Sequence, residues 1–424
     1  MLYRRRIIDS ELDALFPPAA AIAIDGARGV GKTTTAAQRA RAEVRLDSKA
    51  VLEVVSAQPE TILTRARPLL VDEWQRVPEV WDVIRRQVDQ DRTGGQFLLT
   101  GSATPRPGAT AHSGAGRIGR LRMRPMTLTE RGAAASGGIS LAGLLAGGQA
   151  DLDGTSDARL ADYASHIVSS GFPGMAGLTG RALRFELDSY LLNAVDRDVP
   201  ELGKRVRRRG ALMDWLRAYA AATSSTASYS HILNAAAAGQ ADKLARSTAV
   251  AYQDTLADIW LTDPVPAWGP VANPAARLGR TPKHQLADPA LAARLLGLGV
   301  DALLDGQGRP LGPQAGTMLG RLFEALATLC VRVAASAAEA RVSHLRTRDG
   351  DHEVDLVVER ADGMCLPIEV KLSAAVADRD TRHLRWFRER YADLALDAIV
   401  LNTGPHAYRR ADGVGVVPLA LLAP

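Results

Sequence analysis

The chain has 424 residues, of which 46% are hydrophobic and 23% charged, a composition typical of a soluble globular protein. This length predicts about two to four domains. The formal net charge of +5 and the pI of about 9.3 form a mild basic bias. Such a bias is compatible with a nucleic-acid partner but does not identify one.

Cysteine usage and hydropathy argue against several further classes. The two cysteines, Cys330 and Cys365, lie far apart without C-x-x-C spacing, which argues against a zinc site and a disulfide scaffold. A reducing, cytoplasmic compartment is the natural expectation. The N-terminus lacks the apolar core of a signal peptide, and no apolar run reaches the length of a membrane span. We therefore expect no membrane as a partner.

The first 130 residues are predicted to alternate between strands and helices. Residues 19–25 form a short apolar run that leads into glycines, as a buried strand followed by a loop does. Further strands are predicted at 50–55, 68–71, 96–100 and 117–126, and helices at 33–43 and 74–90. This alternation predicts an α/β domain with a parallel sheet and helices on both faces.

The loop after the first strand reads Gly26-Ala27-Arg28-Gly29-Val30-Gly31-Lys32-Thr33 and fits the pattern G-x-x-x-x-G-K-[ST] in full. In this pattern, glycines let backbone N–H groups wrap the β- and γ-phosphates of a nucleotide. Lys32 would neutralise phosphate charge, and the Thr33 hydroxyl would ligate Mg²⁺. The motif follows a predicted strand and opens a predicted helix. Residues 26–34, Thr34 included, are therefore predicted to bind ATP with Mg²⁺.

The strand predicted at 68–71 leads into two carboxylates, Asp72 and Glu73. A buried carboxylate pair at the carboxyl edge of a parallel sheet needs a cation or a chemical role. Asp72 is predicted to hold the Mg²⁺ shell, and Glu73 to orient or activate the attacking water. The alternative is a strand that simply ends at a solvated Asp-Glu pair.

Two weaker candidates for the same site come later in the chain. Thr100 or Ser102, after the strand predicted at 96–100, would contact the γ-phosphate or the water, or would cap the following turn. Arg117 or Arg120 would act as an arginine finger on a neighbouring subunit's ATP, or would be ordinary surface arginines. The sequence leaves both pairs of alternatives open.

The middle of the chain is predicted to be mainly helical, over 158–200 and in three stretches up to about 260. A Gly-, Ala- and Ser-rich stretch at 132–156 is expected to be a domain boundary or a mobile loop. Residues 259–268 would form a β-wing, with the helix that begins at Arg246 as a recognition helix on DNA. The basic run Lys204–Arg209 would add phosphate contacts, or is a solvated helix face. A helical spacer without DNA contact is the alternative.

The last third of the chain carries a second set of charged residues. Helices are predicted at 320–335 and 378–392, and strands at 341–348, 352–359, 364–371 and 396–401. Alternation along a strand puts Glu369 and Lys371 on the same face, and a hairpin would bring Asp355 beside them. Two carboxylates would then bind Mg²⁺ while the lysine polarises a water for attack on a phosphodiester. A plain hairpin with a surface Glu–Lys pair is the alternative.

The N-terminal motifs resemble those of the AAA+ ATPases. More narrowly, nearly the whole chain resembles a bacterial and archaeal group in which such an ATPase is joined to a C-terminal module of unknown function. The residues that carry the likeness are 26–33, 69–76, 97–102, 116–117, 124–128, 170–174, 196–199, 282–284 and 288–289. This resemblance implies ATP binding, a winged-helix middle and a homo-oligomeric ring. The C-terminal pattern resembles the PD-(D/E)xK nuclease fold, which implies Glu324 as a further acidic residue of that site.

Together these features predict four parts: an AAA+ type P-loop domain over 1–135, a linker and helical subdomain over 136–203, a winged-helix-like domain over 204–285, and a mixed α/β nuclease-like domain over 286–424. Three functions are compatible with them. The first is an ATP-driven switch or motor, and the second is an ATP-regulated DNA nuclease. The third is a DNA- or protein-binding regulator for which ATP is a structural ligand.

Overall fold

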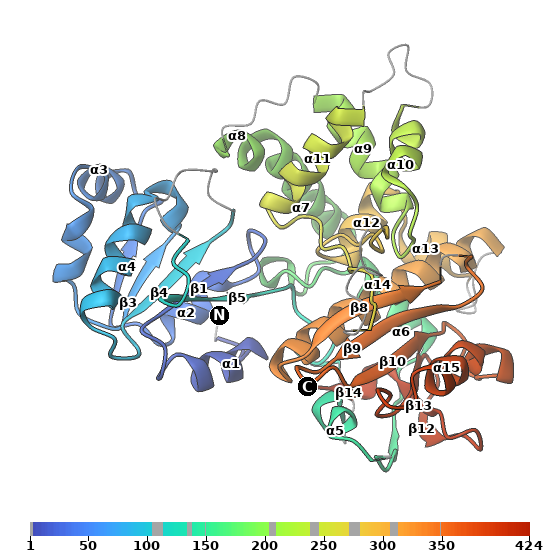
Figure 1. Ribbon diagram of the computed structural model, residues 1–424. Helices are drawn as coiled ribbons and strands as arrows, with labels where there is room; N and C mark the ends of the chain where they lie inside the picture. The colour runs from blue at the N-terminus through green and yellow to red at the C-terminus, as the bar shows by residue number, and fades with distance from the viewer. Residues whose placement is uncertain are drawn as a thin grey trace.

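The computed structural model describes residues 3–103, 113–133, 138–148, 150–202, 209–237, 246–270, 280–305, 313–347 and 349–424. They form an N-terminal α/β lobe, a helical lobe and a C-terminal lobe built on a second sheet (Figure 1). Most of the basic run at 204–209 lies outside the described residues, so its contact with phosphates stays a prediction. Among the described residues, no helix is both long and apolar enough to cross a membrane.

The N-terminal lobe is a parallel sheet with helices, as predicted, and its five strands lie in the order β2-β3-β4-β1-β5. Its strands are β1 (Ala21–Asp25), β2 (Ala42–Arg45), β3 (Leu69–Asp72), β4 (Phe97–Gly101) and β5 (Ile118–Arg122). β1 and β4 are buried along their whole length, which explains their continuous apolar sequence. The parallel register places Asp25 beside Gly101 and Asp72 beside Thr100. The carboxyl ends of the central strands therefore meet at one edge.

Helices α1 (Ile8–Leu15), α2 (Lys32–Ala37), α3 (Lys49–Ala57) and α4 (Glu79–Gln90) belong to this lobe. Two sequence-based predictions are wrong here. The strand predicted at 50–55 is part of α3, because Val51, Leu52 and Val55 repeat at helical spacing and pack on one core cluster. The helix predicted at 33–43 ends at Ala37, because residues 42–45 pair with β3 as the edge strand of the sheet.

The helical lobe follows the predicted pattern. It contains α6 (Leu160–Val168), α7 (Gly180–Asn193), α8 (Val199–Glu201), α9 (Arg209–Ala221), α10 (Tyr229–Ala236), α11 (Arg246–Asp258), α12 (Pro289–Leu295) and α13 (Val300–Leu303). The residues predicted as a β-wing make single bridges to distant segments, Thr262 to Leu286, Val265 to Lys283 and Ala267 to His344. They do not pair with each other in a hairpin, and the winged-helix interpretation stays a prediction.

The C-terminal lobe is a seven-stranded mixed sheet in the order β7-β12-β13-β11-β10-β9-β8. Its elements are β7 (Gly154–Thr155), α14 (Pro313–Ala337), β8 (Arg341–Arg346), β9 (Glu353–Glu359), β10 (Cys365–Val370), α15 (Asp378–Arg390), β11 (Ile399–Asn402), β12 (His406–Arg409) and β13 (Gly415–Pro418). Two short strands, β6 (Ile139–Ser140) and β14 (Leu422–Ala423), form a separate parallel pair. This pair lies beside α5 (Leu141–Leu145). The Gly-rich stretch at 132–156 thus supplies two strands that pair with the end of the chain.

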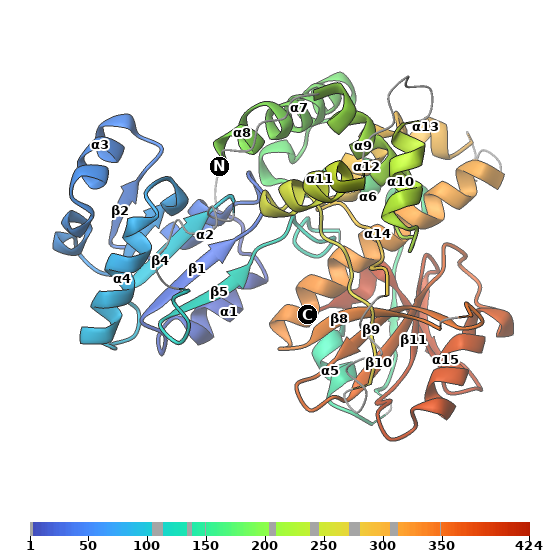
Figure 2. The same ribbon diagram turned by 45° about the horizontal axis from the view of Figure 1, so that its top comes forward.

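One continuous hydrophobic cluster joins the three lobes. It runs from Ile8 and Leu12 of α1 through the helices of the middle to α14, where Leu322 and Phe323 are fully buried. Figure 2 shows α14 between the helical lobe and the C-terminal sheet. Because the lobes share this core, a movement at the edge of one lobe must be accommodated by the others.

Candidate functional site

The phosphate-binding loop joins β1 to α2 and takes backbone conformations that favour glycine. The φ angles of Gly26, Gly29 and Gly31 are +155°, +80° and +104°. A Cβ atom on Gly26 would lie 2.2 Å from the carbonyl oxygen of Met123. Only a residue without a side chain fits there, so the loop stays open for the backbone N–H groups that wrap phosphate.

Lys32 is buried beneath this loop. Its ammonium donates to the carbonyl oxygens of Gly26 and Ala27 at 2.8 and 2.9 Å. Burial lowers the pKa of Lys32 to about 8, although Glu73 and Asp72 favour its charged form. Negative phosphate groups in the loop would therefore stabilise the charged lysine further.

Asp72 lies at the end of β3 and connects two predicted site residues. Its Oδ1 atom accepts hydrogen bonds from the Thr33 hydroxyl at 2.8 Å and from the Thr100 hydroxyl. The predicted Mg²⁺ pair, Thr33 and Asp72, is thus brought together, and Thr100 holds the carboxylate. The Thr34 side chain is exposed one residue further along α2, and its contact with nucleotide stays a prediction.

Glu73 takes a left-handed backbone conformation, with φ of 55°, directly after β3. Non-glycine residues in this region carry strain that often marks a functional position. Its Oε2 atom accepts hydrogen bonds from the Ser102 hydroxyl at 3.0 Å and from the Gln75 amide. Gln75 was not among the predicted site residues, although it lies in the segment 69–76 that carries the family likeness.

The two candidate finger arginines lie in different surroundings. The Arg117 guanidinium donates to Asp89 of α4 at 2.8 Å and is partly exposed. Arg120 donates to Asp25, at the end of β1, at 2.7 Å. Within this chain Arg120 is therefore the arginine tied to the phosphate-binding edge, whereas a role for Arg117 on a neighbouring subunit stays a prediction.

The helical lobe contacts the phosphate-binding loop directly. Cβ atoms added to Gly29 and Gly31 would lie 3.8 Å from Phe172 and 3.6 Å from Pro173, in the turn between α6 and α7. The Tyr190 hydroxyl donates to the Arg28 carbonyl at 3.1 Å, and the Arg28 guanidinium pairs with Asp198. Residues 172–173 and 198 fall in the segments that carry the family likeness, which was the only sequence signal for them.

These residues fit a magnesium–nucleotide complex. The glycine cradle would be filled by any Cβ at Gly26, a buried lysine lies beneath it, and a hydroxyl and a carboxylate share one hydrogen bond at its edge. Oxygen donors of this kind are the ligands that Mg²⁺ prefers, usually with phosphate oxygens and water as the others.

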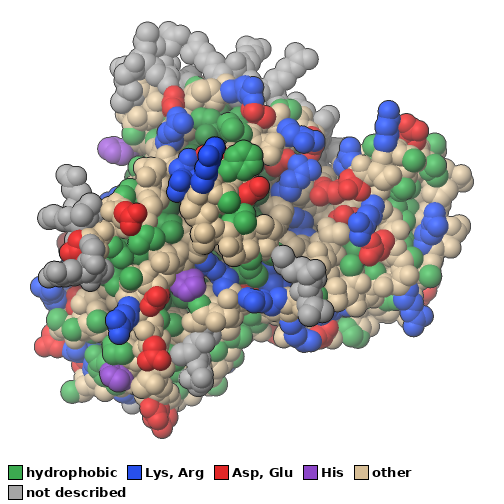
Figure 3. Space-filling model, turned by 180° about the vertical axis from the view of Figure 1, so that it is seen from behind, with side chains coloured by type: hydrophobic (Ala, Val, Ile, Leu, Met, Phe, Trp, Pro, Cys, Tyr) green, Lys and Arg blue, Asp and Glu red, His purple; other side chains and the backbone are tan. Residues whose placement is uncertain are grey.

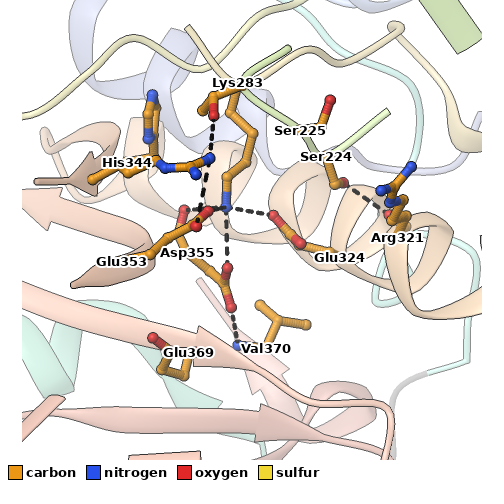
Figure 4. A network of polar contacts seen from close by, with 12 residues as sticks. Ser224, Ser225, Lys283, Arg321, Glu324, His344, Glu353, Asp355, Glu369 and Val370 are labelled. Carbon is orange, nitrogen blue, oxygen red and sulfur yellow. Dashed lines mark hydrogen bonds and ion pairs between the residues drawn. The ribbon is translucent and has the colours of Figure 1, made fainter. Parts of the chain in front are cut away.

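A second polar cluster lies in the C-terminal lobe, and its centre is Lys283 (Figure 4). The Lys283 ammonium is fully buried and lies 2.7 Å from Glu324 Oε1, 3.0 Å from Asp355 Oδ1 and 3.6 Å from Glu353 Oε1. Glu324 and Asp355 were predicted to share one site, whereas Lys283 and Glu353 were not predicted to belong to it. The available signal was that Lys283 is one of only six lysines and lies in the segment 282–284.

The predicted hairpin is confirmed and brings the remaining residues to this cluster. β9 and β10 pair antiparallel, with Leu356 opposite Ile368. The next position along each strand brings Asp355 and Glu369 side by side. Lys371 lies on the same face as Glu369 and donates to its Oε2 atom at 2.5 Å, and the Val370 N–H donates to Asp355 at 2.9 Å.

Burial and two lysines act in opposite directions on this acidic pocket, which we define as Glu324, Glu353, Asp355 and Glu369. It raises the pKa of Glu324 to about 8 and the pKa of Glu369 well above its ordinary value. Burial would also raise the pKa of Asp355, but Lys283 and Lys371 outweigh it and hold that pKa below its usual range.

No group of three or more His, Cys, Asp or Glu among the described residues is arranged to hold a metal ion. In the acidic pocket, the Lys283 ammonium already lies between Glu324 and Asp355. Metal binding by Asp355 and Glu369 therefore stays a prediction, and any ion there would share its carboxylates with this lysine.

Comparison with protein-family models divides the chain in three. Residues 19–131 match an AAA domain, residues 160–302 match a domain of unknown function (DUF8612), and residues 319–422 match another domain of unknown function (DUF4143). The first match covers the sheet and the loop described above. Residues 19–131 are therefore a P-loop ATPase domain.

Two curated relatives and two solved structures resemble larger parts of the chain. The uncharacterized proteins Mb2031c of Mycobacterium bovis and Rv2008c of Mycobacterium tuberculosis are each 26% identical over 99% of this chain and 84% of the relative. A Walker-type ATPase of Pyrococcus abyssi shares 14% identity over 69% of this chain and 96% of its own, with a TM-score of 0.42. The Aeropyrum pernix ORC2 protein shares 15% over 69% and 91%, with a TM-score of 0.30. Scores this low add nothing to what the loop geometry shows.

Proposed function

We propose that this protein hydrolyses ATP with Mg²⁺ and uses the reaction to change how the helical lobe rests on the phosphate-binding loop. The observation that carries this proposal is the convergence of Lys32, Thr33, Asp72 and Glu73 at one edge of the parallel sheet. These residues supply the phosphate charge partner, the metal-binding oxygens and a carboxylate beside the phosphates.

Each residue has a distinct role in the proposed reaction. Lys32 would leave the loop carbonyls and bind the β- and γ-phosphates. Mg²⁺, held by Thr33 and Asp72, would supply positive charge to the phosphate oxygens. Glu73, oriented by Ser102 and Gln75, would accept a proton from the attacking water. Thr100 keeps Asp72 in place through its hydroxyl.

The response of the protein would pass through Phe172, Pro173 and Tyr190, which rest on the loop. Filling the loop with phosphates changes the surface on which these side chains pack. Because the lobes share one hydrophobic cluster, the change can reach the C-terminal lobe. In this way the presence or absence of the nucleotide phosphates would switch the packing between the lobes.

The test is phosphate release by the purified chain with Mg²⁺, beside Lys32→Ala and Glu73→Gln. Lys32→Ala should lose ATP binding, and Glu73→Gln should bind ATP but hydrolyse it at least about a hundredfold more slowly. Lys49→Ala and Glu79→Gln are matched controls, since both side chains are exposed on helices of the same lobe. ATP binding without turnover in the native chain would refute hydrolysis and favour a regulator that keeps ATP as a structural ligand.

A second candidate function is Mg²⁺-dependent DNA cleavage by the C-terminal lobe, regulated by ATP. Its supporting observation is that Glu324, Asp355, Glu369 and Lys371 lie in one pocket. We would measure nicking of supercoiled plasmid with Glu369→Ala and with Glu389→Ala, an exposed control on α15. Nicking that both variants retain would show that a contaminating nuclease causes it. An absence of nicking by the native chain would exclude this activity.

A further inference from the structure

Three arginines converge on one buried carboxylate, Asp263, where the N-terminal lobe meets α14. Arg122 ends β5, Arg124 follows it, and Arg332 lies on α14. Their guanidinium nitrogens lie 3.0, 2.7 and 3.0 Å from the Asp263 carboxylate oxygens. The Asp263 carboxylate can balance only one of these three positive charges.

The excess charge is felt because the groups are buried. Burial lowers the pKa of Arg332 to about 9 even though Asp263 opposes the shift, and Arg124 and Arg122 lower it further by repulsion. A buried cation without a full counter-charge is unfavourable, and an anion beside it relieves that cost.

A cavity of about 670 Å³ adjoins this cluster and has two further arginines, Arg280 and Arg341, on its exposed rim. Lys and Arg side chains gather where the lobes meet on the back of the molecule (Figure 3). The other residues that line the cavity are Pro266, Ala267, Pro282, Ser336, Ala340, Val342 and Ser343. Within the described lining, no side chain is acidic and none is aromatic.

Besides Asp263, Glu11 lies next to this lining, where it accepts a hydrogen bond from Ser336 at 2.9 Å and interacts with Arg124. Glu359 lies opposite Arg341 in the register of β8 and β9. The described residues therefore place three carboxylates, Asp263, Glu11 and Glu359, against five arginines, so positive charge remains in excess. The cavity therefore attracts anions.

The chemistry of the lining selects among anions. Guanidinium groups bind phosphate oxygens through two parallel N–H donors. The cavity volume lies in the range that holds a drug-sized molecule, so it has room for more than one phosphate group. No aromatic side chain lines the described part of the cavity as a stacking platform for a base, which favours a sugar–phosphate backbone over a free nucleotide.

We propose that this arginine cavity binds the phosphate backbone of a nucleic-acid strand. Arg6 links the site to the nucleotide loop: its guanidinium donates to the Val30 carbonyl and to the Arg124 carbonyl, both at 2.8 Å. A strand in the cavity therefore lies one side chain away from the phosphate-binding loop. This inference goes beyond ATP hydrolysis and does not depend on it.

The experiment is fluorescence anisotropy of labelled DNA of about 20 nucleotides, single-stranded and duplex, with the full chain and without nucleotide. The test variant is Arg280→Gln with Arg341→Gln, because both side chains are exposed and the fold should tolerate their loss. The matched control is Arg379→Gln with Arg382→Gln, which removes two exposed charges from α15.

We expect the test variant to lose at least about tenfold in affinity and to show a shallower salt dependence, by about one to two counterions, between about 50 and 200 mM salt. The control should stay within about twofold of the native chain. Equal losses of affinity in both variants would show only diffuse electrostatic attraction to DNA and would overturn the proposal. Native affinity in the test variant would show that DNA does not bind in the cavity. Stabilisation by inorganic phosphate without any DNA binding would also overturn the proposal, in favour of a small phosphate ligand.

Discussion

The ammonium group of Lys283 lies 2.7 Å from a carboxylate oxygen of Glu324 in the C-terminal lobe, although 41 residues separate the two in the chain. Lys283 comes from the segment that also bridges Val265, so a residue outside the C-terminal sheet supplies one of the two cations of its acidic pocket, the other being Lys371. The pocket is thus held in part by a charge contact from a segment outside that sheet.

Removing this cation should destabilise the protein. Lys283→Met keeps the bulk of the side chain but leaves the buried Glu324 without its cation and Asp355 with only the more distant Lys371, at a cost of about 3–5 kcal/mol. Urea unfolding measures the loss. Lys49→Met, an exposed substitution of the same type, should stay within about 0.5 kcal/mol of the native chain. A loss below about 1 kcal/mol for Lys283→Met would show that the pocket is held by something else.

Gly26→Ala should both destabilise the N-terminal lobe and abolish nucleotide binding. The added Cβ would lie 2.2 Å from the Met123 carbonyl oxygen, in a backbone conformation unfavourable to alanine, at a cost of about 3 kcal/mol or more. Gly116→Ala is the control, because its φ is also positive but no atom lies near the added Cβ, so only about 1–2 kcal/mol is expected. Equal thermal shifts for the two variants would contradict the steric argument.

Thr100→Val removes the hydroxyl that holds Asp72 while nearly keeping the volume of the side chain. Misplacing a residue that orients a metal ligand typically costs about 10–100-fold in metal affinity or activity. We therefore expect a rise in the Mg²⁺ concentration needed for half-maximal hydrolysis, with ATP affinity nearly unchanged. Hydrolysis assays across a Mg²⁺ titration measure this, and an unchanged midpoint would remove Thr100 from the site.

Arg117→Ala should leave hydrolysis within about twofold of the native rate, because its partly exposed pair with Asp89 contributes little. Turnover measured at several protein concentrations tests this. A loss of about a thousandfold or more would instead assign Arg117 to the site of a neighbouring subunit.

His344 should make stability depend on pH. Burial, with Lys283 nearby, lowers the pKa of His344 to about 4 from its ordinary value of 6.5. The unfolded chain therefore binds a proton below 6.5 that the folded chain does not bind until about 4, and stability falls as the pH drops through this window by up to about 3 kcal/mol. His344→Gln should reduce that dependence in urea unfolding at both ends of the window. Parallel profiles for the variant and the native chain would exclude this histidine as the cause.

Much of the nucleotide site was predictable because its residues are neighbours in the chain. The loop 26–33 and the pair Asp72 and Glu73 each lie at a strand end, and parallel strands bring their carboxyl ends together without further information. The hairpin that joins Asp355 to Glu369 follows from the same kind of local alternation. Helix α3 shows the limit, since a short apolar run fits a buried strand and a helix face equally well until its burial is known.

The sequence by itself determined the P-loop, the carboxylates beside it and the β-hairpin, because short-range spacing dictates each of them. Only the tertiary structure decided that Lys283 enters the acidic pocket, that Phe172 rests on the loop and that three arginines surround Asp263. These contacts join residues far apart in the chain. Such long-range contacts depend on which apolar faces pack together and on the need to pair each charge that this packing buries. Local sequence periodicity carries no information on either.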